Sequence, residues 1–210
     1  MIKNISSISN QNNNTKNTEK DKTIQERKQK LKECISMMNN ESKFKFWIKT
    51  LISSFNNIPE IIKTVDKIIE IQASSVSFSS EIFNKSKSTY NQVERDIDLS
   101  ERKNALLNIY IMTKEMLKNL EPNDYEFLER KFIFSWSNEE LSSYYQISIR
   151  TVYRKIERII DKIYQCCTKH NWSLKFIENQ ISNEGWLKEK YYKFIADYFK
   201  NINYKTEKQL

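Results

Sequence analysis

The side chains best suited to bind another molecule lie at the start of one predicted helix, directly after Ser148. An arginine in that position can hold a guanine edge through two parallel hydrogen bonds, worth roughly 1–3 kcal/mol of discrimination. Residues near the start of a helix that enters the major groove reach base edges. The candidates for base contacts are therefore Ser148, Ile149, Arg150, Tyr153 and Arg154. Phosphate contacts set the register on a duplex without carrying sequence information, and the candidates for them are Thr151, Lys155, Arg158 and Lys162.

Two helix-start signals and one turn are expected to position these side chains. Ser137 and Glu140 have the spacing of a capping box, in which each side chain accepts the backbone N–H of the other residue. The short helix that begins there ends near Tyr145, residues 146–147 make a turn, and Ser148 caps the next helix. That helix carries a continuous apolar stripe, formed by Val152, Ile156, Ile159, Ile160 and Ile163. We therefore predict a helix-turn-helix over residues 137–164, with Ile147 filling the crease between its helices.

Positive charge is concentrated on the predicted second helix of the motif. The chain has a formal net charge of +8, but its richness in Lys, Asn and Ile is also typical of codon bias in an AT-rich genome, and a basic helix face can simply be solvated. Residues 148–169 hold six basic against two acidic residues, whereas residues 123–147 hold two basic against five acidic residues. Within the motif, the positive charge therefore lies on the predicted second helix, and this placement favours a polyanionic partner, double-stranded DNA.

Residues 140–152 resemble the helix-turn-helix of region 4 in the sigma-70 family. The family pattern E-[IL]-A-x-x-L-G-[IV]-S-x-x-T-V has the same spacing as ELSSYYQISIRTV. The two agree at Glu140, Leu141, Ile147, Ser148, Thr151 and Val152. They differ at Ser142, Tyr145 and Gln146, where the family has Ala, Leu and Gly. Long predicted helices that lead through Glu-Pro-Asn-Asp (121–124) into this motif are also similar to phage late-gene activators of the RinA and ArpU type and to the minor sigma-like factors of mycoplasmas.

The resemblance implies a transcription factor of sigma-like type, in which region 4 binds the promoter −35 element and its flank docks on RNA polymerase. A full sigma factor also has a region 2, whose aromatic residues open the −10 element. Residues 42–97 include Phe44, Phe46 and Trp47 but match no region 2 pattern. Two alternatives stay open, a phage-type activator that does not replace sigma and a packaging protein similar to a terminase small subunit.

The expected fold is all-α. The chain has one Gly and two Pro among 210 residues, which leaves few residues for hairpins and tight turns. We expect a disordered or loosely helical polar segment (1–41), a helical domain (42–121), the helix-turn-helix domain (122–168) and a C-terminal helical extension (169–210). Within the second region, apolar periodicity predicts a serine-rich interruption at 74–80, a helix over about 81–97 and a separate helix over 100–120 capped by Ser100. Asn123 or Asp124 is expected to cap the helix after Pro122.

Other functions find little support in the residues. No phosphate-binding glycine loop or Ser/His/Asp set can be assembled around a single histidine, so we do not expect an enzyme or a cofactor. Cys166, Cys167 and His170 lack a fourth zinc ligand. Three cysteines without a disulfide framework, no signal peptide and no apolar stretch of about 20 residues predict a cytoplasmic protein that does not span a membrane.

Overall fold

The computed structural model describes residues 29, 31–78 and 86–207, and the side chains of residues 29, 31–71 and 93–200. Within these residues all regular elements are helices, which confirms the expected all-α class. The chain divides into two compact units, residues 40–191 and a unit formed by the chain ends, 1–39 and 192–210. Most of the polar segment predicted at 1–41 lies outside the described residues, while residues 31–37 are helical.

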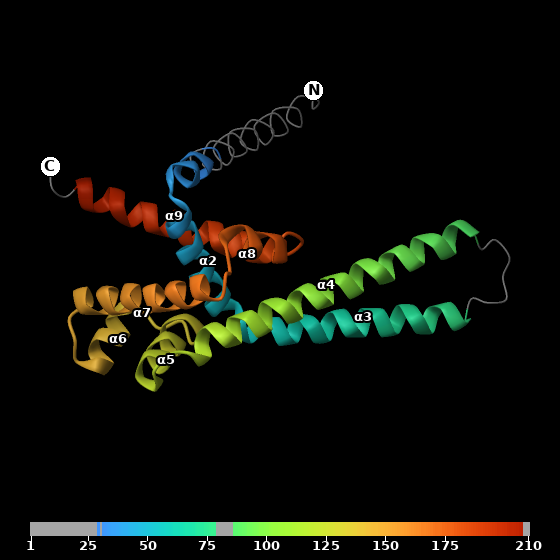
Figure 1. Cartoon of the computed structure of the whole chain (residues 1–210), viewed down its shortest axis with the longest axis horizontal. Coiled ribbons are helices and arrows are strands. Elements are labelled where there is room, and N and C mark those ends of the chain that lie inside the picture. The colour runs from blue at the N-terminus through green and yellow to red at the C-terminus, as the bar shows by residue number, and fades with distance from the viewer. Residues whose placement is uncertain (1–28, 30, 79–85, 208–210) are drawn as a thin grey trace, which may run out of the picture. The chain divides into compact units, whose positions relative to one another are not determined.

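Figure 1 gives the order of the helices along the chain. They are α2 (Asn40–Ser54), the short 3-10 helix η1 (Phe55–Asn57), α3 (Ile58–Phe78), α4 (Ser86–Lys118), α5 (Pro122–Leu128), the π-helical turn η2 (Glu129–Ile133), α6 (Asn138–Tyr145), α7 (Ile149–Lys169), α8 (Leu174–Gln180) and α9 (Gly185–Glu207). The regions predicted as 42–121 and 122–168 both belong to the compact unit 40–191. The four-part division of the chain stays a prediction.

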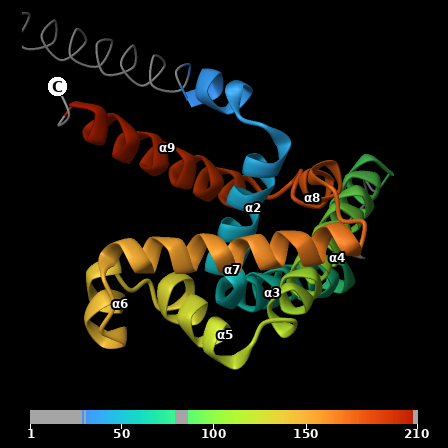
Figure 2. The same ribbon diagram turned by 60° about the vertical axis from the view of Figure 1, so that its left-hand side comes forward.

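Helix α2 contributes much of that core and crosses α7 near its middle (Figure 2). Its fully buried residues are Ile48, Leu51 and Ile52, and Trp47 stacks on Tyr191 with ring centroids 4.0 Å apart. Burying an aliphatic or aromatic side chain of this size contributes about 1.5–3 kcal/mol relative to exposure. Helix α2 thus belongs to the core and also contacts α7 along part of its length.

Helices α3 and α4 run side by side as a long hairpin (Figure 1). An ion pair between Asp66 of α3 and Lys103 of α4, 2.5 Å long, connects the two helices. The predicted break before Ser100 is wrong, because α4 continues from Ser86 to Lys118. No Gly or Pro lies within that range, so a serine on an exposed face does not end the helix. The predicted interruption at 74–80 is also wrong for its first part, since α3 extends to Phe78.

The junction at Glu121 differs from the expected capping. Pro122 occupies the first turn of α5, and no side chain caps its N-terminus. Asp124, predicted as a possible cap, is 5% exposed and instead accepts a hydrogen bond of 2.7 Å from Lys162. Its carboxylate therefore joins α5 to α7 and does not cap the start of α5.

A buried ion pair anchors the end of the compact unit. The Glu184 side chain is 1% exposed. It accepts hydrogen bonds from Nε and Nη2 of Arg102 at 2.9 and 3.2 Å and from Nε1 of Trp186 at 2.7 Å.

Of the helices that the structure describes, none combines the length and the apolar character that a bilayer crossing requires.

Candidate nucleic-acid interface

The first helix of the predicted motif begins with the expected capping box. The Glu140 backbone N–H donates to Ser137 Oγ at 3.1 Å, and the Ser137 N–H donates to Glu140 Oε2 at 2.6 Å. The backbone and side-chain hydrogen bonds from Ser137 lower the pKa of Glu140, so the carboxylate stays charged. These two bonds satisfy donors that an uncapped helix start would leave without partners.

The turn between the helices depends on two of the positions at which the sequence departs from the sigma region 4 pattern. Gln146 adopts the left-handed conformation, with φ 51° and ψ 42°. Ser142 makes two hydrogen bonds with Ile147 across the turn. Its carbonyl accepts the Ile147 N–H at 3.1 Å, and its hydroxyl donates to the Ile147 carbonyl at 2.5 Å. A small polar residue at 142 therefore supplies a hydrogen bond that alanine could not make. The Ile147 side chain is half-buried.

Helix α7 begins where the sequence predicted it. Ser148 Oγ accepts the Thr151 N–H at 3.2 Å, and the hydroxyls of Ser148 and Thr151 lie 2.9 Å apart. The predicted apolar stripe of Val152, Ile156, Ile159, Ile160 and Ile163 is buried, with exposed fractions of 6% or less. Its burial orients the opposite face of α7 toward solvent.

Most of the predicted site residues are exposed. Ile149 and Tyr153 are 42% and 51% exposed. Arg150, Arg154 and Arg158 are exposed as well, and no ion pair or hydrogen bond holds them within the described part of the chain. At a spacing of four residues these arginines follow one side of the helix. We call Arg150, Arg154 and Arg158 the arginine stripe.

Two predicted phosphate ligands already contact other side chains of the protein. Lys155 is half-buried, with its ammonium 4.4 Å from the centroid of the Phe127 ring and 5.1 Å from that of Tyr145. Lys162 Nζ lies 2.7 Å from Asp124 Oδ2 and 3.3 Å from Glu121 Oε1, and the hydrogen bond with Asp124 contributes most to the raised pKa of this lysine. Thr151 is exposed. The phosphate role of Lys155 and Lys162 stays a prediction, and it requires each lysine to leave its present partner.

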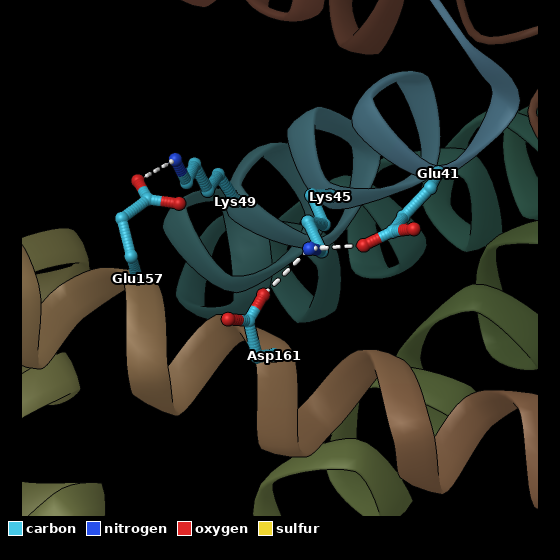
Figure 3. Close-up of polar contacts among 5 residues, drawn as sticks. All are labelled: Glu41, Lys45, Lys49, Glu157 and Asp161. Carbon is cyan, nitrogen blue, oxygen red and sulfur yellow. Dashed lines mark hydrogen bonds and ion pairs between the residues drawn. The ribbon is translucent and has the colours of Figure 1, made fainter.

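Sequence reasoning did not identify two lysines of α2 that reach the same helix. Figure 3 shows Lys49 directed at Glu157, with Nζ 2.7 Å from Oε1, and Lys45 directed at Asp161, with Nζ 2.6 Å from Oδ1. Residues 49 and 157 are 108 positions apart in the chain, so local periodicity holds no signal for this contact. Both carboxylates of α7 therefore face lysines of α2.

A second missed feature lies on the other side of the motif. The Arg130 guanidinium lies 4.7 Å from the Trp136 ring centroid and 4.2 Å from that of Tyr144, and it pairs with Glu126 at 2.8 Å. Trp136 and Tyr144 also line a shallow hollow with Glu139, Glu140 and Ser143. Its acidic lining is unsuited to a phosphate backbone.

The cysteine and histidine residues do not form a metal site within the described part of the chain, where no three His, Cys, Asp or Glu side chains converge on one point. Burial raises the pKa of the Cys167 thiol to about 12, so this thiol is protonated at neutral pH. Comparison of the chain with protein-family models, with curated proteins and with solved structures finds no match.

Proposed function

We propose that this protein is a cytoplasmic, sequence-specific DNA-binding transcription factor of sigma-like type, which recognises promoter DNA with α7 and contacts RNA polymerase. The observation that carries the proposal is the arginine stripe, exposed and unpaired within the described residues, on the second helix of a capped helix-turn-helix. In such motifs the second helix lies in the major groove and its first residues meet base edges. Arg150 and Arg154 are the proposed base contacts, together with Ile149 and Tyr153, and Arg158 is the proposed phosphate contact.

Ser148 has a different part in the proposal. Its hydroxyl already accepts the Thr151 N–H as the cap of α7, so its first contribution is to hold the helix start in place. A base contact by Ser148 would use the remaining hydrogen-bonding capacity of the hydroxyl. We therefore place the sequence discrimination mainly on the arginines.

The test is selection of duplexes from a random pool by the full-length protein, followed by affinity measurements on the enriched sequence. We expect the double variant Arg150→Ala/Arg154→Ala to lose at least about tenfold in affinity, because each bidentate arginine contact is worth roughly 1–3 kcal/mol. Arg95→Ala controls for the loss of an exposed arginine outside the motif, since Arg95 lies on α4. Circular dichroism checks that each variant is folded. Failure to enrich any sequence, or equal affinity of the double variant and the control, would refute the proposal.

A specific observation favours the second candidate, an activator that does not replace sigma. Phe44, Phe46 and Trp47, the aromatic residues considered for promoter opening, are only 3%, 8% and 4% exposed. A side chain that stacks on an unpaired base must be accessible, so these three rings would have to leave the core to act on DNA. Transcription from the enriched sequence distinguishes the two candidates. A sigma-like factor directs core polymerase by itself, whereas an activator requires the housekeeping sigma factor.

A further inference from the structure

The helix proposed to enter the groove carries two acidic residues beside its arginines. Glu157 immediately precedes Arg158, and Asp161 follows one turn later. Their side chains are 55% and 46% exposed. Two uncompensated carboxylates in this position would repel DNA phosphates and reduce the field of the arginine stripe, because unit charges interact over a screening length of about 8 Å at physiological salt.

Helix α2 compensates both carboxylates with a matched pair of lysines. Lys45 and Lys49 are one turn apart on α2, and each reaches one carboxylate on α7 (Figure 3). The lysine side chains are only 21% and 14% exposed. Their ammonium groups therefore lie against the protein, where the contact with α7 and not the solvent is their main environment.

Further contacts hold the two lysines in these positions. Glu41 also pairs with Lys45, and the ammonium of Lys45 lies 5.5 Å from the Tyr164 ring centroid. The ammonium of Lys49 lies 5.2 Å from the centroid of the Phe46 ring. Burial alone would lower the pKa of Lys45, but the hydrogen bonds with Asp161 and Glu41 outweigh it and the pKa is raised. Lys45 accordingly remains a cation at neutral pH.

We propose that Lys45 and Lys49 are positioning residues of the DNA interface, which neutralise Glu157 and Asp161 and so leave the arginine stripe as the dominant charge that α7 presents to a duplex. This inference rests on the proposed function and adds α2 to the DNA-binding unit. The lysines act through the carboxylates and do not touch the DNA. Two helices distant in sequence thus create one cationic surface.

The experiment compares two double variants with the same change in net charge. Lys45→Gln/Lys49→Gln removes the compensating cations, and Lys63→Gln/Lys67→Gln removes two exposed lysines from α3, one of which also pairs with a carboxylate, Glu60. We expect the first variant to bind the enriched duplex about threefold to tenfold more weakly than the second at low salt, and the difference to shrink as salt increases. Unfolding midpoints confirm that both variants are folded at the assay temperature.

A rescue separates compensation from direct contact. Adding Glu157→Gln and Asp161→Asn to Lys45→Gln/Lys49→Gln removes the exposed carboxylates, and we expect affinity to return to the level of the Lys63→Gln/Lys67→Gln control. If the rescue fails in a folded protein, the lysines contact DNA or only support the fold, and the inference is wrong. Equal binding by the two lysine variants would also overturn it.

The proposed function is tested separately from the role of Lys45 and Lys49. If the unmodified protein binds a specific duplex and loses it on Arg150→Ala/Arg154→Ala, the proposed function stands whatever the lysine variants do. If the unmodified protein binds no duplex, both the function and the inference drawn from it fail.

Discussion

The first half of α7 holds five charged residues and the second half three, and the two halves differ in how many of these residues have partners. In the first half, Arg150, Arg154 and Arg158 extend into solvent without a partner among the described residues. In the second half, Asp161 pairs with α2 and Lys162 pairs with Asp124 of α5. A helical wheel alone does not separate these groups, because both lie outside the apolar stripe. The difference teaches that a charged helix face becomes a binding surface only where the surrounding helices leave it uncompensated.

The largest effect on the free energy of unfolding is expected from the apolar stripe of α7, and almost none from the arginine stripe. Ile163 is 1% exposed, and Ile163→Ala should lower the free energy of unfolding by about 2–5 kcal/mol, since it removes buried methyl groups and leaves a cavity. Arg154→Ala should change that free energy by no more than about 0.5 kcal/mol, because its side chain is exposed and has no partner in the part of the chain that the structure describes. Urea denaturation followed by tryptophan fluorescence measures both. A comparable loss for Arg154→Ala would mean that this arginine supports the fold and is not reserved for a ligand.

A smaller effect is expected from the ion pair that occupies the second half of α7. Asp124→Asn and Lys162→Gln should each lower the free energy of unfolding by less than Ile163→Ala, because Lys162 remains accessible to water. The double variant should lose less than the sum of the two, as expected for residues in contact. Strict additivity would show that the pair contributes nothing to stability.

A comparison of Lys162→Gln with Arg158→Ala tests which of these two residues contacts phosphates. Arg158→Ala should weaken duplex binding more than Lys162→Gln, since Arg158 has no partner to leave among the described residues, whereas Lys162 must give up Asp124 and Glu121. If Lys162→Gln weakened duplex binding more than Arg158→Ala, Lys162 would contact DNA in spite of its ion pairs. The DNA-binding part of α7 would then extend at least to residue 162.

The features predicted from the sequence are those set by neighbouring residues. The capping box of Ser137 and Glu140 and the cap at Ser148 lie within four residues of their partners, and the apolar stripe follows from helical periodicity alone. The unbroken α4 was not predicted, because a serine can cap a helix or continue one and only packing decides between them. The environments of Lys155 and Lys162 depend on partners in other helices, which local spacing does not identify. The sequence therefore predicts the motif, while tertiary contacts determine which of its cations are free.

The smallest expected effect concerns the turn that orients the first half of α7. Gln146 has a φ of 51°, in the left-handed region where a side chain with a Cβ is strained and glycine is not. Gln146→Gly should therefore stabilise the protein, by about 0.5–1 kcal/mol, because the relief of strain exceeds the added flexibility of the unfolded chain. Gln146→Ala is the control, since alanine keeps the Cβ and should give no such gain in thermal or urea unfolding. If glycine gave no gain over alanine, the left-handed backbone would not be strained by a Cβ. If glycine exceeded alanine but not the wild-type protein, the Gln146 side chain would have to stabilise the turn through contacts that compensate the backbone strain. The direction of α7 would then depend on that side chain as well as on the bonds of Ser142.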